Sequence, residues 1–544
     1  MNEASLSLIK NGTDDETCSM LQDFSSKHAQ SFAFPELTRS VKQVMVENIV
    51  ERLNNNCSHR CSLLCLTCLR LLSREKSGLD TMTTEQVLKT LAKTAKLEVY
   101  DGSSDVTQDT NSDHPVVIEA QKCLCNLIFN STAAQRICSG NGCVEGIVQR
   151  LKTYEEPLLP HEIKFYDMRM LFLLTALNAD IRPKVRYELH GLTYLIEVLD
   201  LILKSSDTQA TAALSDQDVG LCCEILKILF NLTVTMDRNN LDEEEEAHFM
   251  RLVSVLHNLL LSKTVSKEKQ EDLQSHTVNL LTNMPKDCYE ELLSPVTEGV
   301  SAGLDNKDIE YDGKSMESIV ALLAFLDYRL EKPKKILKEA LTPILHCMCE
   351  MCRANRSIRK FCRTKVLPPL RKEVLNLPEE GPAIRNKLCQ LLTSPITEVK
   401  ELVADFLFVL CKENVGRLVK YTGYGNAAGL LASRGLMCGG RGDGEYSSAS
   451  DESDTEDYDR LKPKVNPVTG RFEEEKIDPM AGMTEEQKEY EAMKLVQCLD
   501  KLHKTGIIQP STIGEDGKPR AVEHILELTE GINIQPENNS DSDS

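Results

Sequence analysis

Residues 219–234 read VGLCCEILKILFNLTV. Their apolar side chains recur at Val219, Cys222, Cys223 and Leu226, which lie on one face when the segment is an α-helix. Similar runs occur at residues 119–129, 168–177 and 276–284, separated by short polar links. Stretches that alternate apolar and polar residues, as half-buried strands do, are few. The sequence therefore predicts an all-α fold.

An asparagine stands at a similar point in four of these runs, at Asn126, Asn178, Asn231 and Asn283. Successive members are 52, 53 and 52 residues apart, and Arg70 lies 56 residues before the first. Armadillo and HEAT repeats have periods of about 40–47 residues. Polar insertions between units account for the difference, because closing a longer surface loop costs little. The spacing therefore predicts an armadillo/HEAT-type α-solenoid superhelix, in which each unit packs only on its neighbours.

Changes in composition divide the chain. We expect a helical-repeat domain over residues 1–422 and, over 423–482, a glycine-rich turn followed by an acidic phosphorylatable linker and an extended segment. Thr484 and Gln487 fit a capping box, so a C-terminal helix is expected at 483–505. Residues 506–544 are expected to form a disordered acidic tail, which makes the C-terminal extension partly disordered.

Charge and composition argue against a protein that binds nucleic acid. The 544 residues are 41% hydrophobic, which suffices for a large core, and they carry a net charge of −21. Residues 441–544 hold 25 acidic against 12 basic side chains, so most of the excess is C-terminal. Binding to nucleic acid is not expected, because phosphate contacts require clustered Lys and Arg.

The first residues of the chain and its cysteines indicate the cellular compartment in which the protein is expected. The first residues, MNEASL, have neither a basic flank nor an apolar core, so no signal peptide is expected. No apolar run is long enough to cross a bilayer. Most of the twenty cysteines lie within helical apolar runs, where a free thiol packs as a small hydrophobe. We expect a soluble, monomeric protein of the reducing cytoplasm.

The first candidate binding residues are the periodic polar side chains. In a solenoid of three-helix units, the last helix of each unit can face the concave groove, where an asparagine can bond the backbone of a bound segment. Two further polar residues stand one helical turn later in the chain: Arg74 after Arg70, and Asn130 after Asn126. The candidates are Arg70, Arg74, Asn126, Asn130, Asn178, Asn231 and Asn283. The alternative is that each asparagine caps a helix or faces solvent.

A second candidate is the basic segment 353–363, which reads RANRSIRKFCR. Arg356, Arg359 and Lys360 share one face of the expected helix. With the two arginines of the first set they can form a positive pocket for an acidic or C-terminal peptide, because Arg presents a planar fork to a carboxylate. The alternative is a solvated basic face.

Phosphorylation is expected in the acidic run that begins at residue 447, SSASDESDTED. Ser448 has Asp451 three residues later and Ser453 has Glu456, the pattern that acidophilic kinases accept. Each phosphate adds a charge of about −1.5 to −2 and can bind an arginine-rich surface. The alternative is an unmodified acidic linker.

Other motifs have simpler interpretations. Two CxxC pairs, Cys65/Cys68 and Cys349/Cys352, lie within apolar helical runs, so core packing explains them better than zinc or redox chemistry. The glycine-rich stretch 423–429 lacks a preceding strand and a GK[ST] motif, so a helix break is expected there rather than a phosphate site. No catalytic set, metal site or cofactor site is expected.

Several stretches resemble the synembryn family, the family of resistance to inhibitors of cholinesterase. They are Ser73–Glu75, Lys122–Asn126, Met168–Leu177, Thr277–Leu281, Arg359–Phe361, Val366–Arg371, Lys420–Leu431, Asn466–Arg471 and Met483–Lys488. Together they extend over nearly the whole chain, and Lys420–Leu431, KYTGYGNAAGLL, is very specific. Details such as His161-Glu162 and Glu188–Gly191 resemble the A paralogue more than the B.

The resemblance implies a fold, an activity and a partner. The fold is an armadillo/HEAT-type superhelix, and the activity is guanine-nucleotide exchange on heterotrimeric G-protein α subunits together with chaperoning of newly made ones. The partner is a monomeric α subunit, GDP-bound or nucleotide-free, which would recruit this chain to the cell cortex or plasma membrane.

The family's groove takes the C-terminal helix of the α subunit. The groove contacts carried over by motif are Arg70, Arg74, Asn126, Arg356, Arg359 and Lys360. The C-terminal helix of this chain would contact the switch region of the nucleotide domain. In the family the acidic linker is phosphorylated, which promotes activity.

Two other functions remain open. A passive scaffold or adaptor of helical repeats would bind acidic or C-terminal peptides without affecting nucleotide. A covalent enzyme is the third hypothesis, because triads scattered in sequence leave no local motif.

Overall fold

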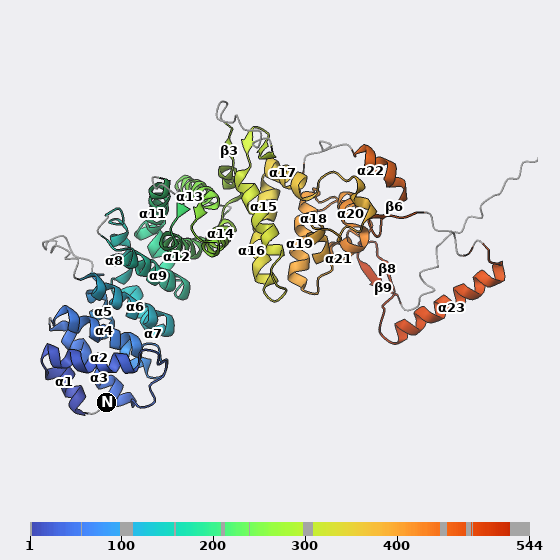
Figure 1. The fold of residues 1–544 in the computed structure, drawn as a ribbon. Helices are drawn as coiled ribbons and strands as arrows, with labels where there is room; N and C mark the ends of the chain where they lie inside the picture. The colour runs from blue at the N-terminus through green and yellow to red at the C-terminus, as the bar shows by residue number, and fades with distance from the viewer. Residues whose placement is uncertain are drawn as a thin grey trace, which may run out of the picture. The chain divides into compact units, whose positions relative to one another are not determined.

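The computed structural model describes residues 3–55, 57–97, 113–156, 159–207, 213–238, 240–296, 308–446, 454–474, 480 and 482–522. Helices dominate it, and its strands are two or three residues long, so the expected all-α class is confirmed (Figure 1). The chain divides into two compact units, unit 1 (Met1–Ser294) and unit 2 (Pro295–Ser544). Among the described residues no helix combines the length and the hydropathy that a membrane span requires.

Unit 1 is built of helices that follow one another along the chain. They are α1 (Glu3–Asn11), α2 (Asp14–Lys27), α3 (Arg39–Asn54), α4 (His59–Leu72), η1 (Leu79–Met82), α5 (Glu85–Thr94), α6 (His114–Asn130), α7 (Thr132–Gly140), α8 (Cys143–Leu151), α9 (His161–Leu177), α10 (Ile181–Pro183), η2 (Lys184–Glu188), α11 (Gly191–Asp207), α12 (Asp216–Thr233), α13 (Glu243–Leu261), α14 (Lys267–Leu281) and η3 (Lys286–Leu292). Two short strands, β1 (Ala213–Leu214) and β2 (Lys263–Thr264), complete the unit, and β3 (Ser294–Pro295) falls at the boundary between the two units. Strands β1 and β2 pair in parallel.

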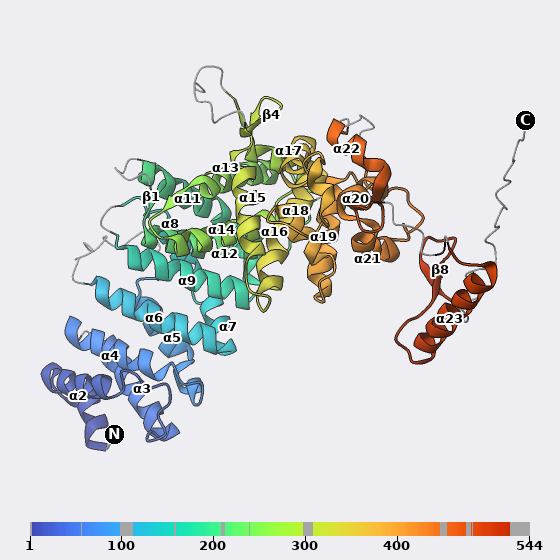
Figure 2. The ribbon, with the colours of Figure 1, turned by 45° about the vertical axis from the view of Figure 1, so that its right-hand side comes forward.

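The helices of unit 1 form two layers. In layer A, α4 packs on α6, α6 on α9, α9 on α12 and α12 on α14. In layer B, α8 packs on α11 and α11 on α13, and each of these three also contacts a helix of layer A (Figure 2). Each helix of layer A thus repeats the position of the one before it, which is the arrangement of an α-solenoid.

Helix α12 illustrates why these sequences are helical. Ser215 is its N-cap and accepts a hydrogen bond from the backbone N–H of Asp218. Val219, Cys222 and Leu226 are buried, as the helical period predicts. Each fully buried aliphatic side chain of this kind stabilises the fold by roughly 1.5–3 kcal/mol. The helix is buried on several sides because both neighbours in layer A pack on it.

Unit 2 is a second helical stack with a C-terminal extension. Its elements are β4 (Glu310–Tyr311), β5 (Lys314–Ser315), α15 (Glu317–Leu330), α16 (Leu337–Ala354), α17 (Arg356–Val366), η5 (Lys372–Leu375), α18 (Ile384–Leu391), α19 (Thr397–Leu410), α20 (Val415–Thr422), α21 (Tyr424–Arg434), α22 (Glu456–Leu461), η6 (Lys462–Lys464), β6 (Val465–Asn466), β7 (Arg471–Phe472), α23 (Glu485–Lys504), β8 (Ser511–Ile513) and β9 (Pro519–Ala521). Helix α16 packs on α15, α17 and α19, and this group forms the core. Thr484 caps α23, and a capping box with Gln487 is present.

The glycine-rich stretch contains a break and then a helix. Gly423 has φ +75°, a conformation that L side chains rarely adopt, and it separates α20 from α21. The first backbone N–H groups of α21, those of Tyr424 and Gly425, donate to the carbonyls of Pro467 and Val468 at 2.8 and 2.9 Å. The turn between β6 and β7 therefore satisfies donors that a helix N-terminus leaves open.

The C-terminal extension is more ordered than the sequence indicates. Residues 511–521, expected to be disordered, form the antiparallel hairpin β8–β9. Helix α22 begins in the expected acidic linker, and the expected extended segment contains the hairpin β6–β7. Both hairpins contact α21, which is far away in sequence. Local composition therefore gave no signal for this order. Residues 523–544 of the expected tail lie outside the described residues.

The cysteines are all free. Burial raises the pKa of the Cys68 thiol to about 12 and holds that of Cys349 well above its ordinary value. Thiols of this kind stay protonated, which suits core packing. In the described part of the chain no group of three or more His, Cys, Asp or Glu is placed to hold a metal ion. Cys438 and Cys498 are exposed.

Candidate functional site

Four cations lie on successive helices of layer A. They are Arg70 of α4, Lys122 of α6, Arg169 of α9 and Lys227 of α12, and we call them the cation row. Their side chains are between 21% and 42% exposed. Each is thus held partly by the protein and partly accessible to a partner.

Two buried glutamates fix the cation row. Glu119 on α6 accepts from Arg70 and lies 3.9 Å from Lys122, measured between Oε2 and Nζ. Glu224 on α12 accepts from Arg169 at 2.9 Å and from Lys227 at 2.6 Å. A buried carboxylate needs such partners, because an unpaired buried charge is strongly destabilising. The glutamates therefore fix the positions of the cations before any partner binds.

Aromatic rings line the same row. The Lys122 ammonium lies 5.3 Å from the centroid of the Tyr166 ring, and that of Lys227 lies 4.6 Å from the ring of Phe172. Such contacts limit the motion of flexible lysines. Phe129, at the end of α6, is 63% exposed. The face thus combines positioned positive charge with accessible apolar surface, which suits an amphipathic, negatively charged peptide.

The two arginines predicted near the start of the row lie close together. Arg74 donates to the carbonyl of Ala29 at 2.8 Å, and its guanidinium lies 5.4 Å from the ring of Phe32. Burial, and then repulsion from Arg70, lower the pKa of Arg74. Arg70 and Arg74 therefore lie close enough together for their charges to interact.

The periodic asparagines connect successive helices. The amide of Asn126 donates to the hydroxyl of Ser73 at 3.0 Å. In the same way Asn231 donates to Thr175, and Asn283 to Thr233, both at 3.1 Å. The three hydroxyls are buried, and each in turn donates to a carbonyl of its own chain segment three or four residues earlier. We call this series the amide ladder.

The amide ladder changes the interpretation of two candidates. Asn231 is 9% exposed and Asn283 is 3% exposed, so neither side chain is accessible to a partner, and the prediction that they bind one is wrong. Asn126, Asn130 and Asn178 are partly exposed and remain candidates. The sequence signal that was missed is the series of hydroxyl residues, Ser73, Thr175 and Thr233, that accept from the asparagines.

Asn283→Ala is expected to lower the free energy of unfolding by about 1–3 kcal/mol, because it leaves the Thr233 hydroxyl and the Phe230 carbonyl without this donor. The affinity for a bound peptide should not change. Urea unfolding and a peptide titration measure the two effects. Asn130→Ala is the control for stability alone: its amide bonds the backbone of Asn126 and is partly exposed, so the free energy of unfolding should change little. A loss of affinity without a loss of stability for Asn283→Ala would contradict the ladder.

The basic face of α17 is only partly open. Arg356 is exposed and Lys360 is partly exposed. Arg359 is 6% exposed: it donates to the carbonyl of Cys352 at 2.7 Å, and its guanidinium lies 4.7 Å from the ring of Tyr446. Of the three cations expected on one face of this helix, Arg359 is therefore the one that is buried. The covering ring belongs to a residue 87 positions later, so no local pattern could indicate it.

Tyr446 is held from a second side. Its hydroxyl donates to Glu413 at 3.1 Å, and burial raises its pKa. Ser448 and Ser453, in the acidic run that follows, lie outside the described residues. The α17 residues belong to unit 2 and the cation row to unit 1, so each is a surface of its own unit.

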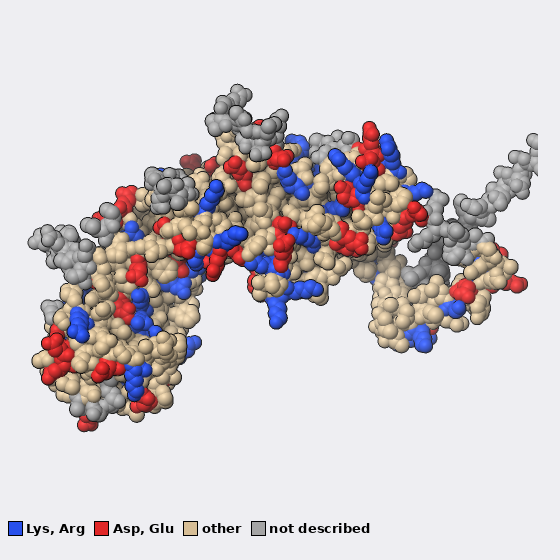
Figure 3. All heavy atoms as spheres, viewed as in Figure 1, with Lys and Arg blue, Asp and Glu red and all other residues tan. Residues whose placement is uncertain are grey.

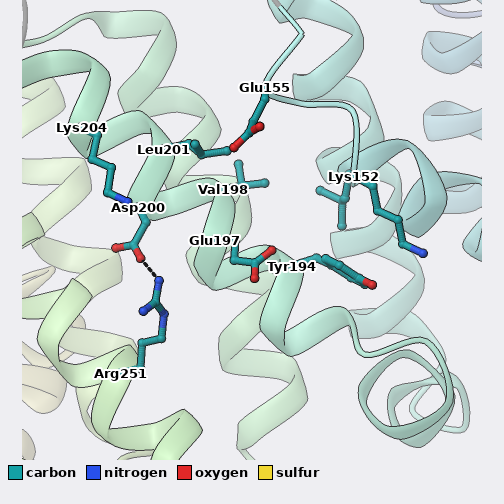
Figure 4. A pocket seen from close by; sticks show the side chains of 10 residues that line it. Lys152, Glu155, Tyr194, Glu197, Val198, Asp200, Leu201, Lys204 and Arg251 are labelled. Carbon is teal, nitrogen blue, oxygen red and sulfur yellow. Dashed lines mark hydrogen bonds and ion pairs between the residues drawn. The ribbon is translucent and has the colours of Figure 1, made fainter.

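A pocket of about 450 Å³ in layer B is a further hollow of unit 1 (Figure 4). Lys152, Glu197 and Arg251 are among its lining residues. Arg251 pairs with Asp200, and the Lys152 ammonium lies 5.1 Å from the ring of Tyr194. Two of its cations are thus held in place, Arg251 by an ion pair and Lys152 by an aromatic ring. On the face shown in Figure 3, Lys and Arg are interspersed with Asp and Glu.

Comparison with known proteins gives a family match. The family described as "Guanine nucleotide exchange factor synembryn" matches residues 65–518. The chain is 43% identical to "Chaperone Ric-8A" of Gallus gallus over 95% of each chain. It is 43% identical to "Chaperone Ric-8A" of Danio rerio over 98% of each chain, and 40% identical to that of Mus musculus over 98% of each.

Comparison with solved structures gives weaker similarities, among them designed armadillo repeat proteins. A designed armadillo repeat protein in complex with the peptide (KR)4 is 14% identical, with a TM-score of 0.34, over 51% of this chain and 98% of that one. A chain from a structure of the interaction between cadherin and β-catenin is 11% identical, with a TM-score of 0.47, over 80% of this chain and 69% of that one.

Proposed function

The chain belongs to the synembryn family of guanine nucleotide exchange factors, and we propose that it promotes nucleotide exchange on heterotrimeric G-protein α subunits and chaperones their folding. Similarity to Ric-8A chaperones over almost the whole length supports both activities and the A paralogue. The observation that carries the mechanism is the cation row, whose charges are fixed by Glu119 and Glu224.

The proposed mechanism is linkage between two binding equilibria and involves no covalent chemistry. A protein that binds the nucleotide-free α subunit more tightly than the GDP-bound one must weaken the binding of GDP to that subunit by the same factor. Capture of the C-terminal helix would remove an element that supports the nucleotide pocket. GTP binding would reverse the capture. An α subunit that has not yet bound nucleotide would be stabilised by the same contacts, which is the chaperone activity.

The C-terminal helix of the α subunit suits the cation row chemically. The C-terminus of a helix is the negative end of its dipole, and the last residue of the α subunit adds a carboxylate. Positioned Arg and Lys bind such a group with charge-assisted hydrogen bonds. We assign the contacts to the cation row, Arg70, Lys122, Arg169 and Lys227, with Arg74, Asn126, Asn130 and Asn178 beside them.

Other parts of the proposal concern unit 2. Arg356 and Lys360 form a second cationic surface that would bind an acidic segment, and Ser448 and Ser453 are proposed phosphorylation sites whose modification promotes activity. Helix α23 would contact the switch region of the nucleotide domain. We further propose a cytoplasmic monomer that the α subunit recruits to the plasma membrane or cell cortex, without a role in nucleic-acid binding.

GDP release from a purified α subunit tests the function. The full-length protein is expected to raise the rate of release of labelled GDP in proportion to its concentration, until the complex is saturated. An α subunit whose C-terminal helix is shortened is the control and should respond weakly. An unchanged release rate with an intact α subunit would contradict exchange. If a C-terminal peptide still bound in that case, the passive scaffold would be the better description.

A further inference from the structure

Helix α23 is joined to the rest of unit 2 on both sides. On its N-terminal side, the turn between β6 and β7 contacts the start of α21, where Gly425 donates to Val468. On its C-terminal side, the hairpin β8–β9 contacts the end of α21 (Figure 1). The two anchors therefore lie at opposite ends of the same helix, and the chain between them carries α23.

The second anchor is a contact between two glycines. Gly435 and Gly517 both have positive φ, +70° and +68°, which favours glycine. A Cβ on Gly435 would lie 2.6 Å from the carbonyl oxygen of Asp516, and a Cβ on Gly517 would overlap the carbonyl oxygen of Gly435. The backbone N–H of Met437 donates to the carbonyl of Gly517 at 3.2 Å. Only two residues without side chains allow this approach.

The hairpin depends on this contact. A two-stranded hairpin by itself is marginally stable in water, and both strands of β8–β9 are exposed along their length. The end of α21 gives it a surface to pack on. Conversely, if the contact were lost, α23 would be attached only through the residues that follow β7.

We infer that the Gly435–Gly517 contact is a latch that keeps α23 in a closed loop and so positions α23 for the α subunit; the second half of this inference rests on the proposed function. The six residues 505–510 link α23 to β8, and the twelve residues 473–484 link it to β7. Fully extended, these links reach roughly 20 and 40 Å. While the latch is closed, the shorter link keeps α23 within about 20 Å of β8. Once the latch is open, only the longer link holds α23, and the volume that α23 can occupy grows up to about eightfold.

The first test measures the latch itself. Cys438 is next to the latch and Cys498 is on α23, and both are exposed, so the natural chain offers two labelling sites. Spin labels on these thiols, in a chain with Cys57→Ser to remove a half-buried third site, should give a narrow distance distribution. Gly517→Asn should broaden it, because Asn tolerates positive φ but its side chain meets Gly435. A distribution unchanged by Gly517→Asn would overturn the latch.

Gly506→Asn is the matched control. Gly506 has φ +71° and follows α23, but a Cβ at this position would meet no atom of the described residues within 4 Å. The same substitution at the same backbone conformation should therefore leave the distance distribution narrow. Gly435→Ala, on the other side of the contact, should reproduce the effect of Gly517→Asn, and circular dichroism should report an unchanged helix content for all three variants.

The second test measures the positioning role. With Gly517→Asn, the protein concentration that gives half-maximal GDP release should rise about five- to eightfold while the maximal rate is retained, and Gly506→Asn should behave like the natural chain. A broadened distance distribution with an unchanged half-maximal concentration would refute positioning but keep the latch. If the natural chain released no GDP, the proposed function would fail, and the label distances would still decide the latch.

Discussion

Replacing Arg169 and Lys227 together by glutamine is expected to weaken binding of the C-terminal helix of the α subunit roughly 100-fold. Each substitution removes a charge-assisted hydrogen bond worth about 1.5 kcal/mol at least, and the pair removes about 3 kcal/mol. Glutamine can still donate to Glu224, so that buried carboxylate keeps a partner. Fluorescence anisotropy of a labelled C-terminal peptide measures the affinity.

The control pair carries the same chemistry on the other layer. Lys204→Gln with Arg251→Gln removes two cations from the pocket of Figure 4 and should leave the affinity unchanged. The natural chain should also lose affinity as salt increases, and the Arg169/Lys227 variant should lose less. Equal affinities for the natural chain and that variant would remove the cation row from the proposed site.

Asp167→Ala is expected to lower the free energy of unfolding of unit 1 by about 3–5 kcal/mol, the cost of breaking a buried charge network. Asp167 is fully buried in α9. It accepts from Gln121 at 2.7 Å and from Tyr154 at 3.2 Å, and it pairs with Arg150 at 3.3 Å. Removing the carboxylate leaves all three groups without this partner. Urea denaturation followed by circular dichroism measures the loss.

The surface pair of Asp200 with Arg251 provides the matched control, because Arg251 is half exposed. Asp200→Ala should cost about 1 kcal/mol or less. A loss for Asp167→Ala that is no larger than this would mean that the network does not stabilise the unit.

The pH dependence of Asp167→Asn follows from the same burial. Burial raises the pKa of Asp167 above its ordinary value of 3.8, although Arg150 opposes this. The folded chain then binds a proton at Asp167 more tightly than the unfolded chain, so protonation of Asp167 stabilises the fold. This stabilisation is complete below pH 3.8 and is lost as the pH rises through the pKa of Asp167 in the folded chain. The natural chain should therefore gain stability relative to Asp167→Asn as the pH falls toward 3.8.

The helical period was sufficient to predict the fold class. Runs such as residues 219–234 form helices whose apolar face is buried, and the regular spacing of the asparagines marked the helices of layer A. The spacing did not reveal which way each amide points. Asn231 and Asn283 point to hydroxyls of the preceding helix, and that direction depends on how the helices pack.

The rest of the site depended on contacts between residues far apart in sequence. Arg359 is covered by Tyr446, and the cation row is fixed by glutamates that lie about fifty residues after the arginines they hold. The hairpin β8–β9 contacts Gly435, about eighty residues earlier in the chain. Single-sequence patterns report the neighbours of a residue along a helix, and none of these partners is such a neighbour.

The amide ladder makes adjacent repeats specific to one another. A unit ending in asparagine needs a hydroxyl in the unit before it, and Thr175 and Thr233 supply it for Asn231 and Asn283. A residue inserted within a helix that carries one of these groups would turn the amide away from its hydroxyl, whereas the loops between units can lengthen at little cost. We therefore expect changes of chain length to be tolerated in the loops of unit 1 and not in the helices that carry the ladder.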